Sequence, residues 1–112
     1  MGEIVTGVSF DTIAREWRMK WSEDGDKTSL AEIQKVLDAH TPALKSIPGL
    51  KGIQRIVCGG CHDFKVIVSL TADSFGAWGE AAFAPEAEFL AAVTAIPGVS
   101  LVETQNFTIM PV

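Results

Sequence analysis

IPGL at residues 47–50 returns as IPGV at residues 96–99. A Pro-Gly pair is typical of a helix end, because proline cannot continue the helix and glycine tolerates the left-handed conformation that often follows. In each copy a helical stripe of apolar residues precedes the pair, and a segment rich in β-branched residues follows it. The chain therefore passes from a helix into a strand at two equivalent places.

The segments around these two places predict the remaining elements. Glu16–Trp21 alternates polar and apolar side chains, as a half-buried strand does. Ser29–Glu32 matches a capping box and predicts the start of a helix that ends at Ile47, with Pro42 disturbing its last turns. We further expect strands at 53–57, 64–70 and 99–110, a short helical turn at 73–78, and a helix from Pro85 to Ile96.

The order strand, helix, strand, then again strand, helix, strand is that of the α+β ferredoxin-like fold, βαββαβ. This fold predicts a four-stranded antiparallel sheet with two helices on one face. A chain of 112 residues that is 47% apolar is long enough for one domain with its own core, which we place at residues 15–112. Residues 1–14 form a separate N-terminal segment, which either adds an edge strand or crosses to a partner.

Composition excludes several classes of function. The net charge of −5 argues against nucleic-acid binding, and no apolar run approaches the roughly 18 residues that a membrane span needs. We see no export signal in the first residues, so with only two cysteines we expect a cytoplasmic protein with reduced thiols. We expect no cofactor and no bound metal.

The stretch CGGCHDF, residues 58–64, matches motifs for covalent haem attachment, for redox chemistry and for zinc. It lies between two predicted strands, so Gly59-Gly60 is also a two-residue hairpin turn. That turn would place Cys58 opposite Cys61, with their Cα atoms about 5.5 Å apart. We favour two thiols that border a turn, and a regulatory disulfide or reactive thiol pair is the main alternative. Zinc and haem are weaker alternatives, because a structural zinc site uses four ligands and haem attachment normally requires export.

The hairpin also assigns side chains to the two faces of the sheet. Trp17, Met19 and Trp21 should face the helices, together with the apolar residues of the two hairpin strands. Arg18, Lys20 and Lys65 should lie on the opposite, half-polar face. Such a cationic face would suit an anionic or phenolic ligand, or it is simply solvated or packed against a second subunit.

His40 is the candidate catalytic residue. It follows Val36 and Leu37 at helical spacing, so it lies on the apolar stripe of the first helix. A neutral imidazole there would serve as a general acid or base in a pocket between helix and sheet. Alternatively, His40 is a core residue bonded to a backbone carbonyl that Pro42 leaves without a partner.

Phe75, Trp78 and Phe83 form an aromatic group before the second helix, with Gly76 and Gly79 between them. Aromatic side chains separated by glycines can form a mobile lid over an apolar pocket. They can equally close the open end of the core. We name all three as candidate ligand-binding residues.

The stretches GIQRIVCGGCHDFKVIVSL (52–70) and EFLAAVTAIPGVSLVETQNFTIM (88–110) resemble the ligand-sensing domain of the leucine-responsive regulator family. The chain lacks that family's helix-turn-helix domain. As a whole it is similar to small stand-alone members of the dimeric α/β-barrel superfamily, which includes stress-responsive barrel proteins, polyketide cyclases and cofactor-free monooxygenases. The resemblance implies a homodimer formed by the open sheet faces, with a pocket for a small molecule.

Three functions remain open at this point. The first is a cofactor-free enzyme for a small hydrophobic or aromatic substrate, with His40 as acid or base. The second is a binding or sensor module without catalysis. The third is a redox-responsive protein that uses Cys58 and Cys61.

Overall fold

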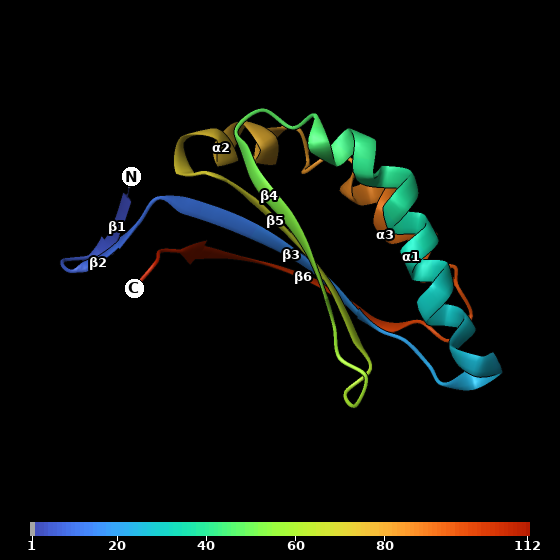
Figure 1. Cartoon of the computed structure of the whole chain (residues 1–112). Helices are drawn as coiled ribbons and strands as arrows, with labels where there is room; N and C mark the ends of the chain where they lie inside the picture. Colours follow the sequence, from blue (N-terminus) through green and yellow to red (C-terminus); the bar gives the residue numbers. More distant parts are fainter. Residues whose placement is uncertain (1) are drawn as a thin grey trace.

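The computed structural model describes residues 2–112, and a four-stranded antiparallel sheet is its centre. The strands lie in the order β4-β5-β3-β6, which is the ferredoxin-like order that the sequence predicts. Figure 1 shows the elements, whose bounds are β1 (Gly2–Val5), β2 (Val8–Phe10), β3 (Thr12–Lys20), α1 (Asp24–Lys45), β4 (Leu50–Val57), β5 (Asp63–Thr71), α2 (Ala72–Glu80), α3 (Glu86–Thr94) and β6 (Ser100–Ile109).

The helices cover one face of the sheet and leave the other face open (Figure 1). Trp17 and Met19 of β3 pair with Val66 and Phe64 of β5, and all four side chains are buried. The predicted division of side chains between the two faces is therefore confirmed. The helices complete this core with Ile33, Leu37, Leu44, Phe89 and Val93. Three helices cover the sheet rather than two, because the predicted turn at 73–78 is a helix of nine residues, α2.

Helix α1 begins earlier than the capping box predicts. Gly25 and the next two residues are left-handed, so the regular helix starts only after Lys27. Ser29 does not cap it: its hydroxyl accepts a hydrogen bond from the backbone N–H of Ser22 at 2.9 Å. The Ser29 side chain is buried in this contact, and it ties the helix start to the end of β3.

Pro42 does not interrupt α1, which continues to Lys45. Proline removes the hydrogen bond to the carbonyl four residues earlier, which belongs to Asp38. Asp38 is exposed, so water can replace the missing bond. The prediction that the end of this helix is disturbed is therefore wrong at this point.

The N-terminal segment forms a hairpin of its own. Strands β1 and β2 pair only with each other in a two-stranded sheet, so they are not an edge strand of the main sheet. Figure 1 shows this hairpin at one end of the molecule, near the C-terminus, and it exposes Ile4, Val5 and Val8. Strand β3 begins at Thr12, three residues before the expected domain start, because residues 12–14 already pair with β5 and β6. Within residues 2–112, no helix combines the length and the apolar character that crossing a membrane requires.

Candidate functional site

An apolar pocket of about 500 Å³ lies where the end of α1, helix α2 and the approach to α3 meet. Its volume lies within the range of small-molecule sites. Ser46 and Ser74 contribute the only side-chain hydroxyls, and no charged side chain lines it. The other lining residues are Ala43, Ile47, Pro48, Ala77, Trp78, Ala81, Ala84 and Pro85. The pocket can therefore hold a small apolar or aromatic molecule.

The predicted aromatic group comes together beside this pocket. The ring centroids of Phe75, Trp78 and Phe83 lie 5.1 to 5.8 Å apart in edge-on and tilted contacts. Phe75 and Trp78 are buried, and the indole N–H of Trp78 donates to the carbonyl of Ala84 at 2.9 Å. Trp78 therefore offers the pocket only its apolar ring. This tight packing is closer to a plug that closes the core than to an open lid.

Phe83 connects the aromatic group to a polar network that sequence reasoning missed. Ala82 and Phe83 both have left-handed backbones, with φ near +56°, and this places the Phe83 ring over the Arg15 guanidinium at 3.9 Å. Arg15 forms an ion pair with Glu86 at the start of α3. The same carboxylate accepts the indole N–H of Trp17 at 2.7 Å.

Strand β6 completes this network on its other side. Arg15 also donates to Asn106 at 2.7 Å and to Thr104 at 3.1 Å. Arg15 and Glu86 are each less than one-fifth exposed. They lie 71 residues apart in the sequence, so no local motif could have shown that they pair. The network fixes the start of α3 on the sheet, directly after Pro85, which lines the pocket.

His40 lies on the inner side of α1, half-buried against the ring of Phe89 at 5.7 Å. Its Nδ1 is 2.8 Å from the carbonyl of Val36, so this carbonyl, and not that of Asp38, is its backbone partner. His40 precedes Ala43 by one helical turn but does not itself line the pocket. If Nδ1 carries the proton and donates to Val36, Nε2 is the basic nitrogen.

The three predicted cations lie on the open face, away from the pocket. Each one pairs with a carboxylate: Arg18 with Glu103, Lys20 with Asp63, and Lys65 with Glu16. Glu16 is buried, although it lies on the open face, and it also accepts from Arg18 and Gln105. The structure thus separates the predicted ligand-binding residues into two groups, and the cationic group is balanced in charge.

The β4–β5 loop is larger than the predicted two-residue turn. The backbone N–H of Cys58 donates to the carbonyl of Asp63, so Cys61 is not its partner in the ladder, and the left-handed residue of the loop is His62, with φ of +61°. The sulfurs of Cys58 and Cys61 form a disulfide, with Cα atoms 5.5 Å apart. The connecting turn is therefore confirmed, whereas its size and the expected free thiols are not.

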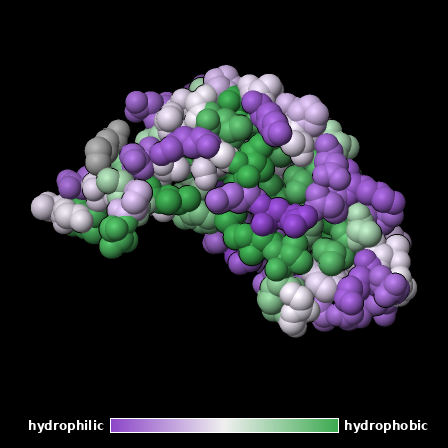
Figure 2. Space-filling view, in the orientation of Figure 1, coloured by the Kyte–Doolittle hydropathy of each residue, from purple (hydrophilic) through white to green (hydrophobic). Residues whose placement is uncertain are grey.

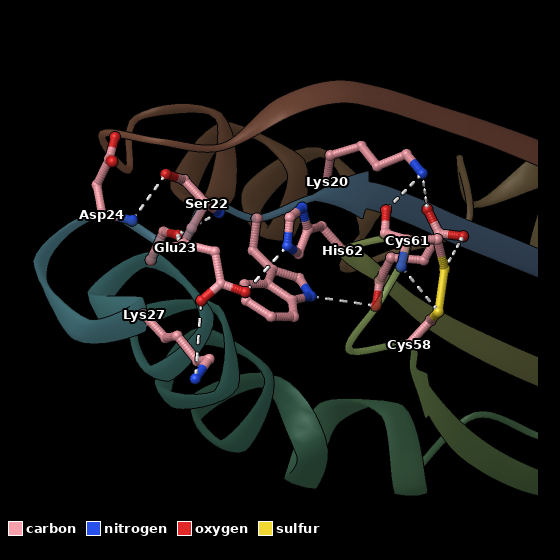
Figure 3. Close-up of polar contacts among 11 residues, drawn as sticks. Lys20, Ser22, Glu23, Asp24, Lys27, Cys58, Cys61 and His62 are labelled. Atoms are coloured by element: carbon pink, nitrogen blue, oxygen red, sulfur yellow. Dashed lines mark hydrogen bonds and ion pairs between the residues drawn. A yellow bond between two sulfur atoms is a disulfide. The ribbon is translucent and has the colours of Figure 1, made fainter.

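Side chains from β3 and the start of α1 hold this loop (Figure 3). Lys20 donates to the carbonyl of Cys61 at 2.8 Å. The His62 ring packs edge-on against Trp21, and its Nε2 lies 3.0 Å from Glu23. His62 is thus directed toward α1. In residues 2–112 no three His, Cys, Asp or Glu side chains are grouped closely enough to share a metal ion.

The fold and the pocket together define a ferredoxin-like α+β protein with an apolar pocket. No family model and no curated protein matches the sequence. Among solved structures, the chain resembles SnoaB, a cofactor-independent oxygenase from Streptomyces nogalater, with a TM-score of 0.60 and 21% identity over 91% of this chain and 96% of that one.

Two further solved structures share the fold. The heme-degrader MhuD from Mycobacterium tuberculosis, solved with two hemes in its active site, gives a TM-score of 0.58 at 17% identity, over 88% of this chain and 96% of MhuD. A dimeric ferredoxin-like protein from Thermobifida fusca gives 0.55 at 20% identity, over 90% of this chain and 93% of that one. The expected ferredoxin-like fold is thereby confirmed, and SnoaB and MhuD carry different chemistries on it.

Proposed function

We propose that this protein is a homodimer that binds a small apolar or aromatic molecule in the pocket formed by the end of α1, helix α2 and the segment before α3. The apolar lining of this pocket, with Trp78 on one wall, is the observation that carries the proposal. A flat aromatic ligand would stack on the indole, and Ser46 or Ser74 would orient its polar group. The absence of a charged lining residue favours binding without catalysis over an enzyme.

The open face of the sheet supports the homodimer. It carries cations and carboxylates side by side, so two copies can match opposite charges across a twofold axis. The same face also carries apolar side chains, including the half-exposed Ile56 and Ile109. The structural neighbour from Thermobifida fusca is described as dimeric, which agrees with such an assembly.

A cofactor-free oxygenase is the second candidate, because SnoaB has that activity on the same fold. Such an enzyme needs a base that converts the substrate to an electron-rich anion. His40 is our candidate, since its Nδ1 contact with Val36 leaves Nε2 available. Oxygen uptake with 1-naphthol would test this candidate. Loss of uptake in His40→Ala but not in His62→Ala would support it, and full uptake in His40→Ala would remove His40 from the mechanism.

Native mass spectrometry of protein purified from its own cells tests the binding proposal directly, since a retained organic mass identifies the ligand class. Titration with 1-naphthol, followed by tryptophan fluorescence, provides a defined probe. Ala77→Phe places a ring in the pocket and should abolish saturable binding. Ala91→Phe adds the same ring at an exposed site on α3 and is the matched control. Equal binding by both variants would show that the ligand lies elsewhere.

A further inference from the structure

We propose that Cys58 and Cys61 form a thiol–disulfide exchange site, in which Cys58 is the attacking thiolate and Cys61 the resolving thiol. Its reaction partner is an exposed disulfide or the thiols that form it, such as oxidised and reduced glutathione. The site lies in the β4–β5 loop, separate from the proposed ligand pocket, so it does not depend on the proposed function.

Access and proximity are the first requirements for exchange. Cys61 is exposed and Cys58 is half-buried, so a small disulfide can reach the sulfurs. The backbone already holds the two Cα atoms 5.5 Å apart, which suits a disulfide. Lys20 and the contacts of His62 fix the loop on β3 and α1, so the two residues remain adjacent when the bond opens.

The surroundings of the two sulfurs differ in a way that assigns their roles. The Cys58 sulfur accepts the backbone N–H of Cys61 at 3.1 Å. A hydrogen bond of this kind stabilises a thiolate more than a thiol, because the negative charge accepts it more strongly. Cys58 is therefore the better nucleophile when the pair is reduced.

Cys61 has the opposite environment. Its sulfur lies 3.3 Å from Oδ2 of Asp63, and the other oxygen of that carboxylate is 2.6 Å from the Lys20 ammonium. The hydrogen bond from Lys20 lowers the pKa of Asp63 below its usual range, so the carboxylate is charged at neutral pH. A negative charge disfavours a second one beside it, so the reduced Cys61 remains a thiol and donates a hydrogen bond to Asp63.

These contacts give a balanced two-step exchange. The Cys58 thiolate attacks one sulfur of the external disulfide, forms a mixed disulfide and expels the first external thiolate. Cys61 then loses its proton to water, and its thiolate attacks Cys58 and expels the second external thiolate. The two expelled thiolates take up the two protons that Cys58 and Cys61 released. The protein loses two electrons, and the external disulfide gains them as two thiols. A reducing dithiol runs the same steps in reverse.

The intact chain can be tested in glutathione buffers of varied redox ratio, with acid quenching, alkylation and mass spectrometry. We expect the wild type to change between a form with two alkylated cysteines and a form with none, at a reproducible ratio. If the two cysteines stay fully alkylated in oxidised glutathione, or the disulfide resists excess reduced glutathione, the exchange proposal is wrong.

Single variants test the two roles. At neutral pH iodoacetamide should alkylate Cys58 in Cys61→Ser about tenfold faster than Cys61 in Cys58→Ser, because the backbone N–H stabilises the Cys58 thiolate and the Asp63 carboxylate opposes that of Cys61. Asp63→Asn, added to Cys58→Ser, should accelerate alkylation of Cys61, whereas Asp38→Asn, a distant exposed change, should not. Equal rates and pH profiles for the two cysteines, in variants whose circular dichroism matches the wild type, would contradict the assigned roles.

Discussion

Glu86 is the residue on which the polar network around Arg15 depends, because its carboxylate binds both Arg15 and Trp17. It accepts from the Arg15 guanidinium through two nitrogens and from the indole of Trp17. Arg15 cannot lose its proton, so any loss of this carboxylate leaves a largely buried cation without its partner. The network therefore acts as the anchor of α3 on the sheet.

We predict that Glu86→Gln lowers the free energy of unfolding by about 1–3 kcal/mol, since it removes the charge and leaves one carbonyl oxygen for three donors. Urea denaturation measures the change. Glu88→Gln changes an exposed carboxylate in the same turn of α3 and should stay within about 0.5 kcal/mol of the wild type. Equal effects for the two variants would show that the network adds nothing beyond surface charge at the helix start.

The clustering of residues close in sequence was predictable, and the pairing of residues far apart was not. Phe75, Trp78 and Phe83 occur within nine positions, so the sequence alone identifies them as a group. The structure brings their rings together. Arg15 and Glu86 meet only because β3 and α3 are adjacent in the fold. The small alanines and serines that shape the pocket carry no sequence signal, since their contribution is the space they leave.

At the scale of elements, the β4–β5 hairpin shows that an error in the predicted length of a turn can leave the assignment of side chains to the two sheet faces correct. A two-residue turn would pair Cys58 with Cys61, whereas the observed ladder pairs Val57 with Phe64. The two registers differ by two residues in their partners, and a pleated strand repeats its face every two residues. The assignment of Phe64 and Val66 to the core is therefore correct, whereas the predicted size of the loop is wrong.

The two Pro-Gly turns give the prediction at this scale. Gly49 and Gly98 both have positive φ, so alanine at either position is strained by about 1–2 kcal/mol. A Cβ on Gly49 would also overlap the side chain of Ser74 in α2, whereas one on Gly98 would lie 3.2 Å from the Cβ of Ser22. Overpacking adds about 1–3 kcal/mol, so Gly49→Ala should be clearly the more destabilising of the two.

Thermal and urea unfolding of both variants measure this difference. Gly52→Ala is the control, because a Cβ there meets no other atom within 4 Å and the backbone needs no positive φ. Its stability should stay close to that of the wild type. If Gly98→Ala proved as costly as Gly49→Ala, the contact with α2 would have no part in the effect.

At the scale of the whole molecule, the chain leaves apolar surface that its own elements do not cover. The molecule measures 49 × 27 × 18 Å, and the N-terminal hairpin extends it at one end (Figure 2). Ile4, Val5 and Val8 of that hairpin are at least half exposed, and an isolated two-stranded hairpin is only marginally stable in water. The sequence alone could not decide between an edge strand and a segment that crosses to a partner, because both need the same apolar strand. The structure excludes the edge-strand alternative, and the crossing of this segment to a partner stays a prediction.

If the dimer forms through the open sheet face, substitutions on the two faces of β6 should affect it differently. Phe107 of β6 pairs with Ala14 and shares its open face, whereas the next residue, Thr108, points to the helix side. Phe107→Asp places a charge where a second sheet would pack about 10 Å away, so it should convert the dimer to a monomer. Thr108→Asp places the same charge at an exposed site on the other face and should leave the dimer intact.

Light scattering coupled to size-exclusion chromatography, at micromolar and at tenfold higher concentrations, measures the mass of each variant. Circular dichroism confirms that each one is folded. A wild type that remains monomeric at the higher concentration would contradict the homodimer itself. A dimer that persists in Phe107→Asp and dissociates in Thr108→Asp would place the interface on the helix side, where it would cover the ligand pocket instead of leaving it accessible.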